Sequence, residues 1–312
     1  MNAITTNSVF RDNTMLSSYK TCPRSFQLRH KFSFVPDKTA IPLVFGQCWH
    51  SAQDIIWSQA KNFNQEDLRK FAMLKFLETW EENGMPPELS LEDLERLKAR
   101  TPMVGEEMIL NYISQRWNIL QSCEVLACEQ PFAVPLPNVE NTWYVGRLDK
   151  VIHHNGQTIV IEHKTTTDYK IDGGFKTAYI EGWDMDSQVK GYEYGAGLYF
   201  NAEQVWVDAA LVHAKVHDKF RFIPVCHQRN MLDEWIVNTV EWVNRVEVDT
   251  ARNFFPKNES SCSGKFGPCQ FVDICRNCPE PEQLHGTPAG YKVEPWSPFE
   301  TLGLQELIKE YP

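Results

Sequence analysis

One β-hairpin signal constrains this chain more than any other feature of its sequence. Residues 143–165 contain two runs rich in strand-forming side chains, which flank the dipeptide Asn155-Gly156. Asn-Gly between two such runs favours a type I′ turn, because that turn needs positive φ at both central residues. We therefore predict an antiparallel hairpin in which His154 faces Gln157, and the rest of the register follows by counting away from the turn.

The predicted register gathers charged side chains on one face of the hairpin. Asp149 lies directly opposite Glu162, while Lys164 shares the face of Glu162 and Arg147 lies opposite Lys164. Two opposed carboxylates repel each other, and Mg²⁺ or Mn²⁺ would offset this repulsion because both ions prefer carboxylate oxygens. The neighbouring lysine could hold an attacking water or stabilise a pentavalent phosphate. The alternative, from this spacing alone, is a solvated strand face with ordinary charges.

Composition narrows the class of protein. The chain has 312 residues, of which 42% are hydrophobic and 23% charged, as in ordinary globular proteins. The net charge of −10 argues against a protein that coats nucleic acid with its whole surface, but it leaves room for a local basic groove. No apolar run approaches the roughly 18 residues of a membrane helix, and residues 1–7 do not resemble a signal peptide. We therefore expect a cytoplasmic protein without disulfides.

The order of helical and strand patterns predicts an α/β protein. We expect one domain over residues 1–312, with a central mixed β-sheet flanked by helices. Helical periodicity covers residues 42–60 and continues through residues 61–122. We interpret the second range, 61–122, as a helical insert. Strands are expected at 125–134, 205–214 and 219–225 besides the hairpin, a loop at 168–182, and helices from Asp186 and over 232–248.

Two further features near the start of the chain suggest binding. The segment from Arg11 to Lys31 contains five Lys or Arg residues and one Asp, a basic excess within an acidic chain. It could follow a nucleic-acid backbone, although a solvated helix face is the plainer explanation. His50 lies four residues after Gly46 on a predicted helix, where it is either a core histidine or a ligand.

The cysteines cluster near the end of the chain. Cys262, Cys269, Cys275 and Cys278 fall within 17 residues, and no histidine lies among them. In a reducing compartment such clustering indicates a metal ion or an iron–sulfur cluster. Two arrangements remain open: a local zinc site of these four cysteines, or a site in which Cys22 joins three of them and closes a long loop.

Taken in order, these motifs resemble those of the PD-(D/E)XK nuclease superfamily. The motifs are Leu-Ser-x-Tyr-x-x-Cys-Pro-Arg-x-Phe, Gly-x-x-x-His, Gly-Arg-Leu-Asp, Ile-Glu-His-Lys, Gln-x-x-x-Tyr and Cys-x₆-Cys-x₅-Cys, over residues 14–50 and 125–278. The most similar branch is that of RecB-like and CRISPR-associated exonucleases with a [4Fe–4S] cluster. Leu148 stands where the family name has proline, a position that varies in this branch.

The resemblance implies roles at the matching positions. Catalytic residues would be Asp149, Glu162, Lys164, Gln188 and Tyr192. The divalent metal, Mg²⁺ or Mn²⁺, would be held by His50, Asp149, Glu162 and the carbonyl of His163. The cluster would be held by Cys22, Cys262, Cys269 and Cys275. The last three lie in a segment over residues 249–283 that would close onto the N-terminal helix. Cys278 could replace one of these ligands. DNA contacts would come from Lys20, Arg24, Arg147 and Tyr192.

A protein of this family would hydrolyse phosphodiester bonds. The resemblance implies a metal-dependent DNA exonuclease acting on single-stranded ends in recombination, repair or phage DNA metabolism. The chain contains no G-x₄-G-K-[ST] phosphate loop, so a helicase or recombination partner would be a separate chain. The sequence leaves two alternatives: a non-cleaving nucleic-acid-binding module with the same fold, and a zinc-stabilised interaction protein. It does not indicate the oligomeric state.

Overall fold

The computed structural model divides the chain into two compact units. It describes residues 4, 8–86, 88–170, 174–213, 219–264, 267–278 and 280–305. The first unit comprises Met1–Lys38, Pro131–Gly146 and Arg229–Pro312, and the second comprises Thr39–Gln130 and Arg147–Gln228. The expectation of a single nuclease domain over the whole chain stays a prediction.

The second unit opens with the helices predicted from residue 42 onward. These are α3 (Ile41–Gln59), α4 (Gln65–Glu82), α5 (Leu91–Leu97) and α6 (Pro102–Ser122). Local chemistry sets their starts: the side chains of Asn64, Ser90 and Thr101 each accept a hydrogen bond from a first-turn amide, and prolines occupy the first turns of α3 and α6. Helices α4 to α6 fall within residues 61–122, and that this segment is an insert stays a prediction.

The strands follow, and the first two of them run through both units. They are β3 (Glu124–Pro135), β4 (Thr142–His154), β5 (Gln157–Thr166), β6 (Gln204–Leu211) and β7 (Phe220–Val225). The described residues between β5 and β6 form the short helix α7 (Thr177–Glu181), the 3₁₀ turn η2 (Gly182–Met185) and the longer helix α8 (Ser187–Phe200). The loop expected at 168–182 was therefore wrong in part, because α7 occupies its end.

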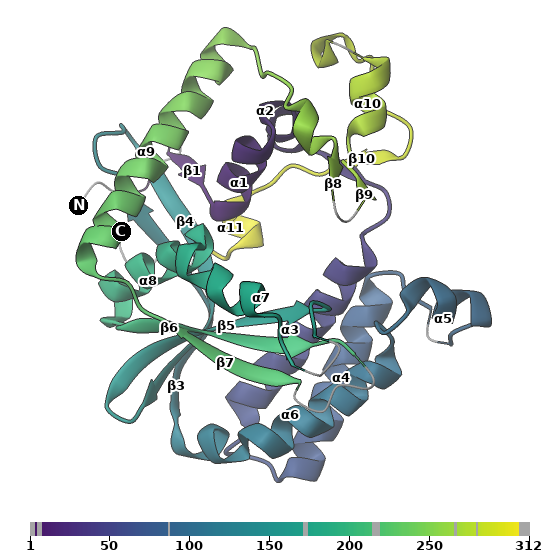
Figure 1. The fold of residues 1–312 in the computed structure, drawn as a ribbon, viewed down its shortest axis with the longest axis vertical. Coiled ribbons are helices and arrows are strands. Elements are labelled where there is room, and N and C mark those ends of the chain that lie inside the picture. Colours follow the sequence, from purple (N-terminus) through teal and green to yellow (C-terminus); the bar gives the residue numbers. More distant parts are fainter. Residues whose placement is uncertain are drawn as a thin grey trace. The chain divides into compact units, whose positions relative to one another are not determined.

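The sheet is mixed, as predicted. Its order is β1-β4-β5-β6-β7, with β3 also paired to β4 (Figure 1). The hairpin register is the one counted from the turn: His154 pairs with Gln157 and Val151 with Val160. Strand β5 runs parallel to β6, and β6 runs antiparallel to β7. The predicted α/β architecture with a helix-flanked mixed sheet is confirmed.

One apolar core joins the helices of the second unit to its strands. Buried side chains of α3, α4 and α6 pack with Ile159 and Ile161 of β5 and with Phe220 of β7. Because strand side chains alternate, the opposite face of β5 carries Glu162 and Lys164, which face α8. The sheet thus separates an apolar face under the helices from a polar face beneath α8.

The first unit is built from the two ends of the chain. Its N-terminal elements are β1 (Val9–Arg11), α1 (Asn13–Thr21), α2 (Pro23–Phe26), η1 (Gln27–Lys31) and β2 (Phe34–Pro36). Its C-terminal elements are α9 (Arg229–Arg252), η3 (Glu259–Ser261), β8 (Ser263–Gly264), β9 (Gly267–Pro268), α10 (Val272–Asn277), η4 (Pro281–Gln283), β10 (Tyr291–Val293) and α11 (Pro298–Thr301).

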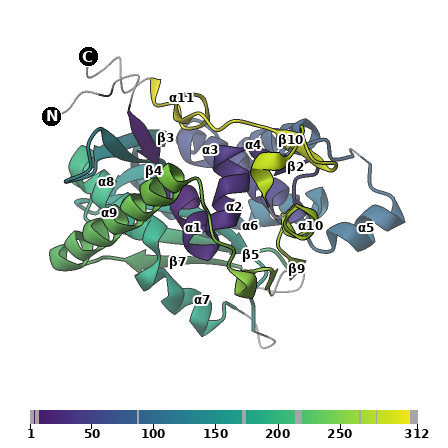
Figure 2. The same ribbon diagram turned by 90° about the horizontal axis from the view of Figure 1, so that it is seen from above.

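Packing holds these two ends together within the unit. Strand β10 pairs with β2, and β1 pairs with the first residues of β4. Helices α1 and α9 lie side by side, with Tyr19 donating a hydrogen bond to Asp249 at 2.6 Å (Figure 2). In the part of the chain that the structure describes, no helix is both long and apolar enough to span a membrane.

Candidate active site

The hairpin brings together three of the five predicted catalytic residues, Asp149, Glu162 and Lys164. The main-chain N–H of His163 donates a hydrogen bond of 2.8 Å to Oδ2 of Asp149, which ties the two strands together at the polar end of the hairpin. Lys164 forms an ion pair with Glu162 on the same face. Asp149 and Glu162 are both buried, whereas Lys164 is partly exposed. The arrangement is a buried carboxylate pair with one ammonium beside it.

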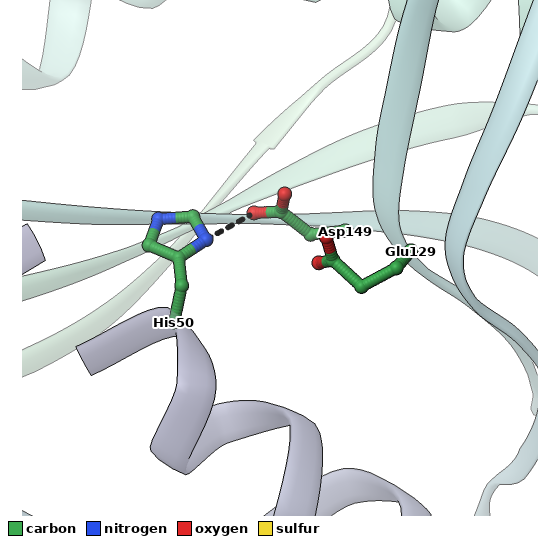
Figure 3. A group of neighbouring side chains, drawn as sticks. All are labelled: His50, Glu129 and Asp149. Carbon is green, nitrogen blue, oxygen red and sulfur yellow. Dashed lines mark ion pairs between the residues drawn. The ribbon is translucent and has the colours of Figure 1, made fainter. Parts of the chain in front are cut away.

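A third strand and a helix add ligand atoms to this pair. His50 of α3 points toward the hairpin, and its Nδ1 lies 3.3 Å from Oδ2 of Asp149. Glu129 of β3 reaches the same place, so one ligand atom from each of His50, Glu129 and Asp149 lies within 4.8 Å of the other two (Figure 3). Among the described residues, this is the only group of three such side chains that close together.

Glu129 was not among the ligands predicted from the sequence. Its backbone has φ of +50°, which is unusual for a non-glycine residue within a strand and is typical of bulges and of functional positions. Its carboxylate pairs with Arg147 at 2.8 Å and lies 3.8 Å from Nζ of Lys150. No spacing rule connects a glutamate on β3 with the hairpin that follows it, so only the fold shows that they meet.

The two hairpin carboxylates differ in electrostatics. Burial alone would raise the pKa of Asp149, but His50, His163 and the nearby lysines lower it to about 2. Burial, and then the neighbouring Asp149, raise the pKa of Glu162 to about 8. In the metal-free site, Asp149 therefore loses its proton at lower pH than Glu162 does.

The remaining groups have the charge states that a metal-binding site needs. Burial lowers the pKa of His50, so its imidazole is neutral and able to bind a metal. Burial alone would lower the pKa of Lys164, but the carboxylates of Glu162 and Asp149 raise it, so this side chain remains an ammonium. Burial raises the pKa of Glu129 to about 7, with Asp149 contributing.

Helix α8 orients the polar face of β5. Its N-cap residue Asp186 accepts hydrogen bonds from the first-turn amides, which places Gln188 over the sheet. The Gln188 amide donates to Glu162 at 3.2 Å and to the hydroxyl of Tyr192 at 2.8 Å, and its carbonyl accepts from Lys164 at 3.1 Å. Tyr192 is buried. Gln188 therefore holds the carboxylate and the ammonium in one arrangement.

The donor set fits a divalent cation. Oε2 of Glu162 and Oε1 of Glu129 are buried and have no hydrogen-bond partner in the described residues. Buried carboxylate oxygens without a partner are costly, and a hard cation such as Mg²⁺ or Mn²⁺ would satisfy them. A neutral imidazole beside them is a common additional ligand.

The structure places the predicted cluster cysteines in the first unit. Cys22 ends α1, and its sulfur lies 3.4 Å from the amide N of Asn258, while the amide of Cys269 donates to the carbonyl of Cys262 at 2.9 Å. Burial raises the pKa of Cys269 against a backbone hydrogen bond at Phe271 that lowers it, and Cys22 and Cys262 add smaller contributions in the direction of burial. Burial raises the pKa of Cys275 as well, and Cys22 and Cys269 act in the same direction.

The sulfur of Cys278 donates a hydrogen bond to the carbonyl of Glu280 at 3.2 Å.

The predicted DNA contacts have unequal exposure. Lys20 is half-buried, and its ammonium lies 5.6 Å from the centre of the Trp242 ring. Arg147 is partly exposed and paired with Glu129. Arg24 is buried, and its Nε donates to the carbonyl of Phe255 at 3.1 Å. A buried guanidinium held in this way is poorly placed to contact a DNA backbone.

The fold and this site together define the class of protein. A family model, the PD-(D/E)XK nuclease superfamily, matches residues 13–276. The chain belongs to the PD-(D/E)XK nuclease superfamily, whose members use divalent metals. No curated protein matches the chain.

Two solved structures align with the chain at low sequence identity, and only the first has a TM-score that indicates a shared fold. A candidate exonuclease from Eubacterium rectale aligns with a TM-score of 0.50 and 12% identity, covering 91% of each chain. An alkaline exonuclease from Laribacter hongkongensis, LHK-Exo, aligns with a TM-score of 0.30 and 10% identity, covering 66% of this chain and 93% of that one. These likenesses concern the fold alone.

Proposed function

We propose that the protein is a metal-dependent DNA exonuclease of the RecB-like branch that hydrolyses single-stranded ends in recombination, repair or phage DNA metabolism. The observation that carries this proposal is the convergence of His50, Asp149, Glu162 and Lys164 in one unit of a PD-(D/E)XK chain. The Eubacterium rectale protein with the same fold is a candidate exonuclease, which agrees with this activity.

The residues of the site have complementary roles in this proposal. His50, Asp149, Glu162 and the His163 carbonyl would hold Mg²⁺ or Mn²⁺, and Glu129 would add a fifth ligand. A bound divalent ion lowers the pKa of water and neutralises charge on the phosphate. Lys164 would hold the attacking water or stabilise the phosphate as the bond from water oxygen to phosphorus forms and the bond to the leaving sugar oxygen breaks.

Gln188 and Tyr192 would support this arrangement. The Gln188 amide bridges Glu162 and Lys164, and the Tyr192 hydroxyl accepts from that amide. Lys20 and Arg147 are the basic side chains proposed to contact the DNA backbone.

We also propose a [4Fe–4S] cluster held by Cys22, Cys262, Cys269 and Cys275. The thiols lie near enough to act on one another: besides burial, Cys22 and Cys262 raise the pKa of Cys269, and Cys22 and Cys269 raise that of Cys275. This grouping supports a shared metal centre, and the resemblance of the motifs favours an iron–sulfur cluster over a zinc ion.

Two cations lie beside these cysteines. Lys257 donates a hydrogen bond of 2.9 Å to the carbonyl of Cys275, and both Lys257 and Arg24 act to lower the pKa of Cys275 against the larger effect of burial. We propose that Arg24 offsets the negative charge of the cluster and does not contact DNA.

The function is tested with anaerobically purified protein and single-stranded DNA labelled at either end. Degradation is measured with Mn²⁺, with Mg²⁺ and with chelator, beside circular single-stranded DNA, which offers no end. Lys164→Ala should lower the rate by about 10²-fold or more, as expected for loss of an electrostatic stabiliser. The matched control is Lys70→Ala, since Lys70 pairs with the exposed Glu66 on α4.

Each outcome of this assay has a distinct meaning. Metal-dependent loss of linear DNA, slowed by Lys164→Ala and unaffected by Lys70→Ala, would support the nuclease. Glu129→Gln should raise the metal concentration needed for half-maximal rate. Binding of DNA without degradation by the wild-type protein would contradict the proposal and favour a non-cleaving nucleic-acid-binding module.

A further inference from the structure

A buried polar chain lies beneath the strand that carries Glu162 and Lys164. Nε1 of Trp57 donates to the hydroxyl of Tyr112 at 3.0 Å, and that hydroxyl donates to Oδ2 of Asp208 at 2.5 Å. The same Asp208 oxygen lies 3.1 Å from Nδ1 of His163. Asp208, His163 and Tyr112 are each at most 1% exposed, so these hydrogen bonds form away from solvent.

This chain meets the metal site at His163. The residue lies between Glu162 and Lys164, and strand alternation turns its ring toward the opposite face of the sheet. Its main-chain N–H donates to Asp149 at 2.8 Å, and its carbonyl is a proposed metal ligand. Asp208 is its direct partner in the parallel register of β5 and β6. Whatever holds the His163 ring therefore also orients the backbone at the metal site.

The other end of the chain meets the helix that carries His50. Trp57 lies two turns after His50 on α3 and contacts the His163 ring, with the ring centres 6.2 Å apart. Tyr112 comes from α6. The network thus connects the helix that supplies the histidine with the strand that supplies the carboxylate.

The protons of the network can be assigned from its partners. Burial raises the pKa of Tyr112 well above its ordinary value, so the phenol keeps its proton and donates it to the carboxylate. Asp208 can then only accept, which places the His163 proton on Nδ1. Arg116 lies 3.6 Å from the other Asp208 oxygen and 3.8 Å from the centre of the Phe222 ring, where it balances the buried charge.

Stability does not require a buried polar network at this position. The neighbouring side chains form the main hydrophobic core of the unit. Burying a carboxylate costs free energy that its partners offset only in part, and apolar replacements of such groups are often as stable. Partners behind metal ligands, in contrast, fix the orientation of those ligands and strengthen metal binding.

We propose that Asp208 is a positioning residue of the metal site: through His163 it orients the backbone of β5 and the Asp149 carboxylate for a divalent cation. The inference rests on the proposed metal-dependent function. Tyr112 and Trp57 hold Asp208 in place from the helical side, so the helices and the sheet set the ligand geometry together.

The test measures Mn²⁺ binding by calorimetry without DNA, so the readout does not depend on turnover. Asp208→Asn should weaken Mn²⁺ binding by about 10- to 100-fold, the usual effect of losing a partner behind a metal ligand. Tyr112→Phe removes only the hydroxyl and should weaken binding less. The nuclease rate of Asp208→Asn should be closer to the wild-type rate at saturating Mn²⁺ than at low Mn²⁺.

Glu193→Gln is the matched control. Glu193 is a buried carboxylate of the same unit that lies 2.6 Å from Nδ1 of the buried His227, and neither residue is among the proposed ligands. This variant should lose thermal stability as Asp208→Asn does while binding Mn²⁺ like the wild type. The comparison separates positioning from general destabilisation.

Three results would overturn the inference. A folded Asp208→Asn protein with unchanged Mn²⁺ affinity would exclude the positioning role, and equal weakening in Glu193→Gln would reduce it to stability. If Asp208→Asn does not fold, Tyr112→Phe decides, and unchanged Mn²⁺ binding in that variant excludes the role. A wild-type protein that binds no Mn²⁺ would refute the metal-dependent function itself, and the inference with it.

Discussion

At the scale of single residues, the site depends on two carboxyl groups whose pKa values are shifted in opposite directions. Asp149 faces His50 and the lysines and remains ionised, whereas Glu162 lies deeper and beside another carboxylate. Two neighbouring carboxyl groups resist ionising together unless a cation balances their charges. Metal binding near neutral pH should therefore release a proton from the pair.

Glu162→Gln should stabilise the metal-free protein more at pH 8 than at pH 5. The pKa of Glu162 is about 8 when folded, against an ordinary value of 4.5, so between these values the folded state holds the proton and the unfolded chain loses it. The free energy of unfolding consequently falls as pH rises through this window, with no penalty below 4.5 and the full penalty above 8. Glutamine removes the penalty.

Thermal unfolding in chelator at the two pH values measures this difference. Saturating Mg²⁺ should make the wild type more stable than Glu162→Gln, because the ion binds the Glu162 carboxylate better than the glutamine amide. An identical shift of Tm at pH 5 and pH 8 would show that Glu162 is ionised throughout.

At the scale of elements, helices α4 and α6 touch at a glycine. A Cβ atom added to Gly105 would lie 2.7 Å from Cζ of Phe76 and within 3.1 Å of two more atoms of that ring. Phe76 is fully buried and packs edge-on against Phe45 with ring centres 5.5 Å apart, so it has little room to move. The absent side chain at Gly105 sets how closely the two helices approach.

Gly105→Ala should lower the free energy of unfolding by about 1–2 kcal/mol. Alanine favours a helix over glycine by about 1 kcal/mol, but overpacking a core costs about 1–3 kcal/mol. Gly197→Ala on α8 is the control, since its Cβ would meet only ordinary contact at 3.8 Å, and it should be neutral or stabilising. Denaturant unfolding measures both, and Phe76→Leu should rescue Gly105→Ala. A stabilised Gly105→Ala protein would contradict this packing.

At the scale of the whole molecule, the first unit joins the two ends of the chain. Cys22 ends the N-terminal helix α1, and the other three proposed ligands follow the long helix α9. A ligand set that closes so long a loop removes more chain entropy from the unfolded state than a local one. The ligand set therefore bears on the stability of the unit as a whole.

The anaerobically purified protein should be brown, with broad absorbance near roughly 400 nm from thiolate-bound iron. Cys22→Ser and Cys275→Ser should lose most of the iron and absorbance and unfold at lower temperature. Cys278→Ser should keep both, because its sulfur turns toward Glu280. Colourless protein containing zinc would support the alternative of a zinc-stabilised interaction protein, and loss of iron in Cys278→Ser would change the ligand set.

Much of the fold follows from local sequence signals. The Asn155-Gly156 turn and side-chain alternation predict the hairpin register, and apolar periodicity predicts α3 to within one residue at each end and a helical pattern over residues 61–122. Local patterns do not show the short strands that depend on distant partners: β1 pairs with β4, and β2 pairs with β10.

The sequence by itself therefore determined that Asp149, Glu162 and Lys164 share one face of the hairpin, because strand pairing and side-chain alternation are local rules. Only the tertiary structure brought Glu129 to that face and Asp208 beneath it, because both depend on which strands and helices pack together. It also buried Arg24, which the sequence alone suggested as a DNA contact. Residue spacing records contacts within a hairpin or a helix, while contacts between distant segments arise from burying a common core.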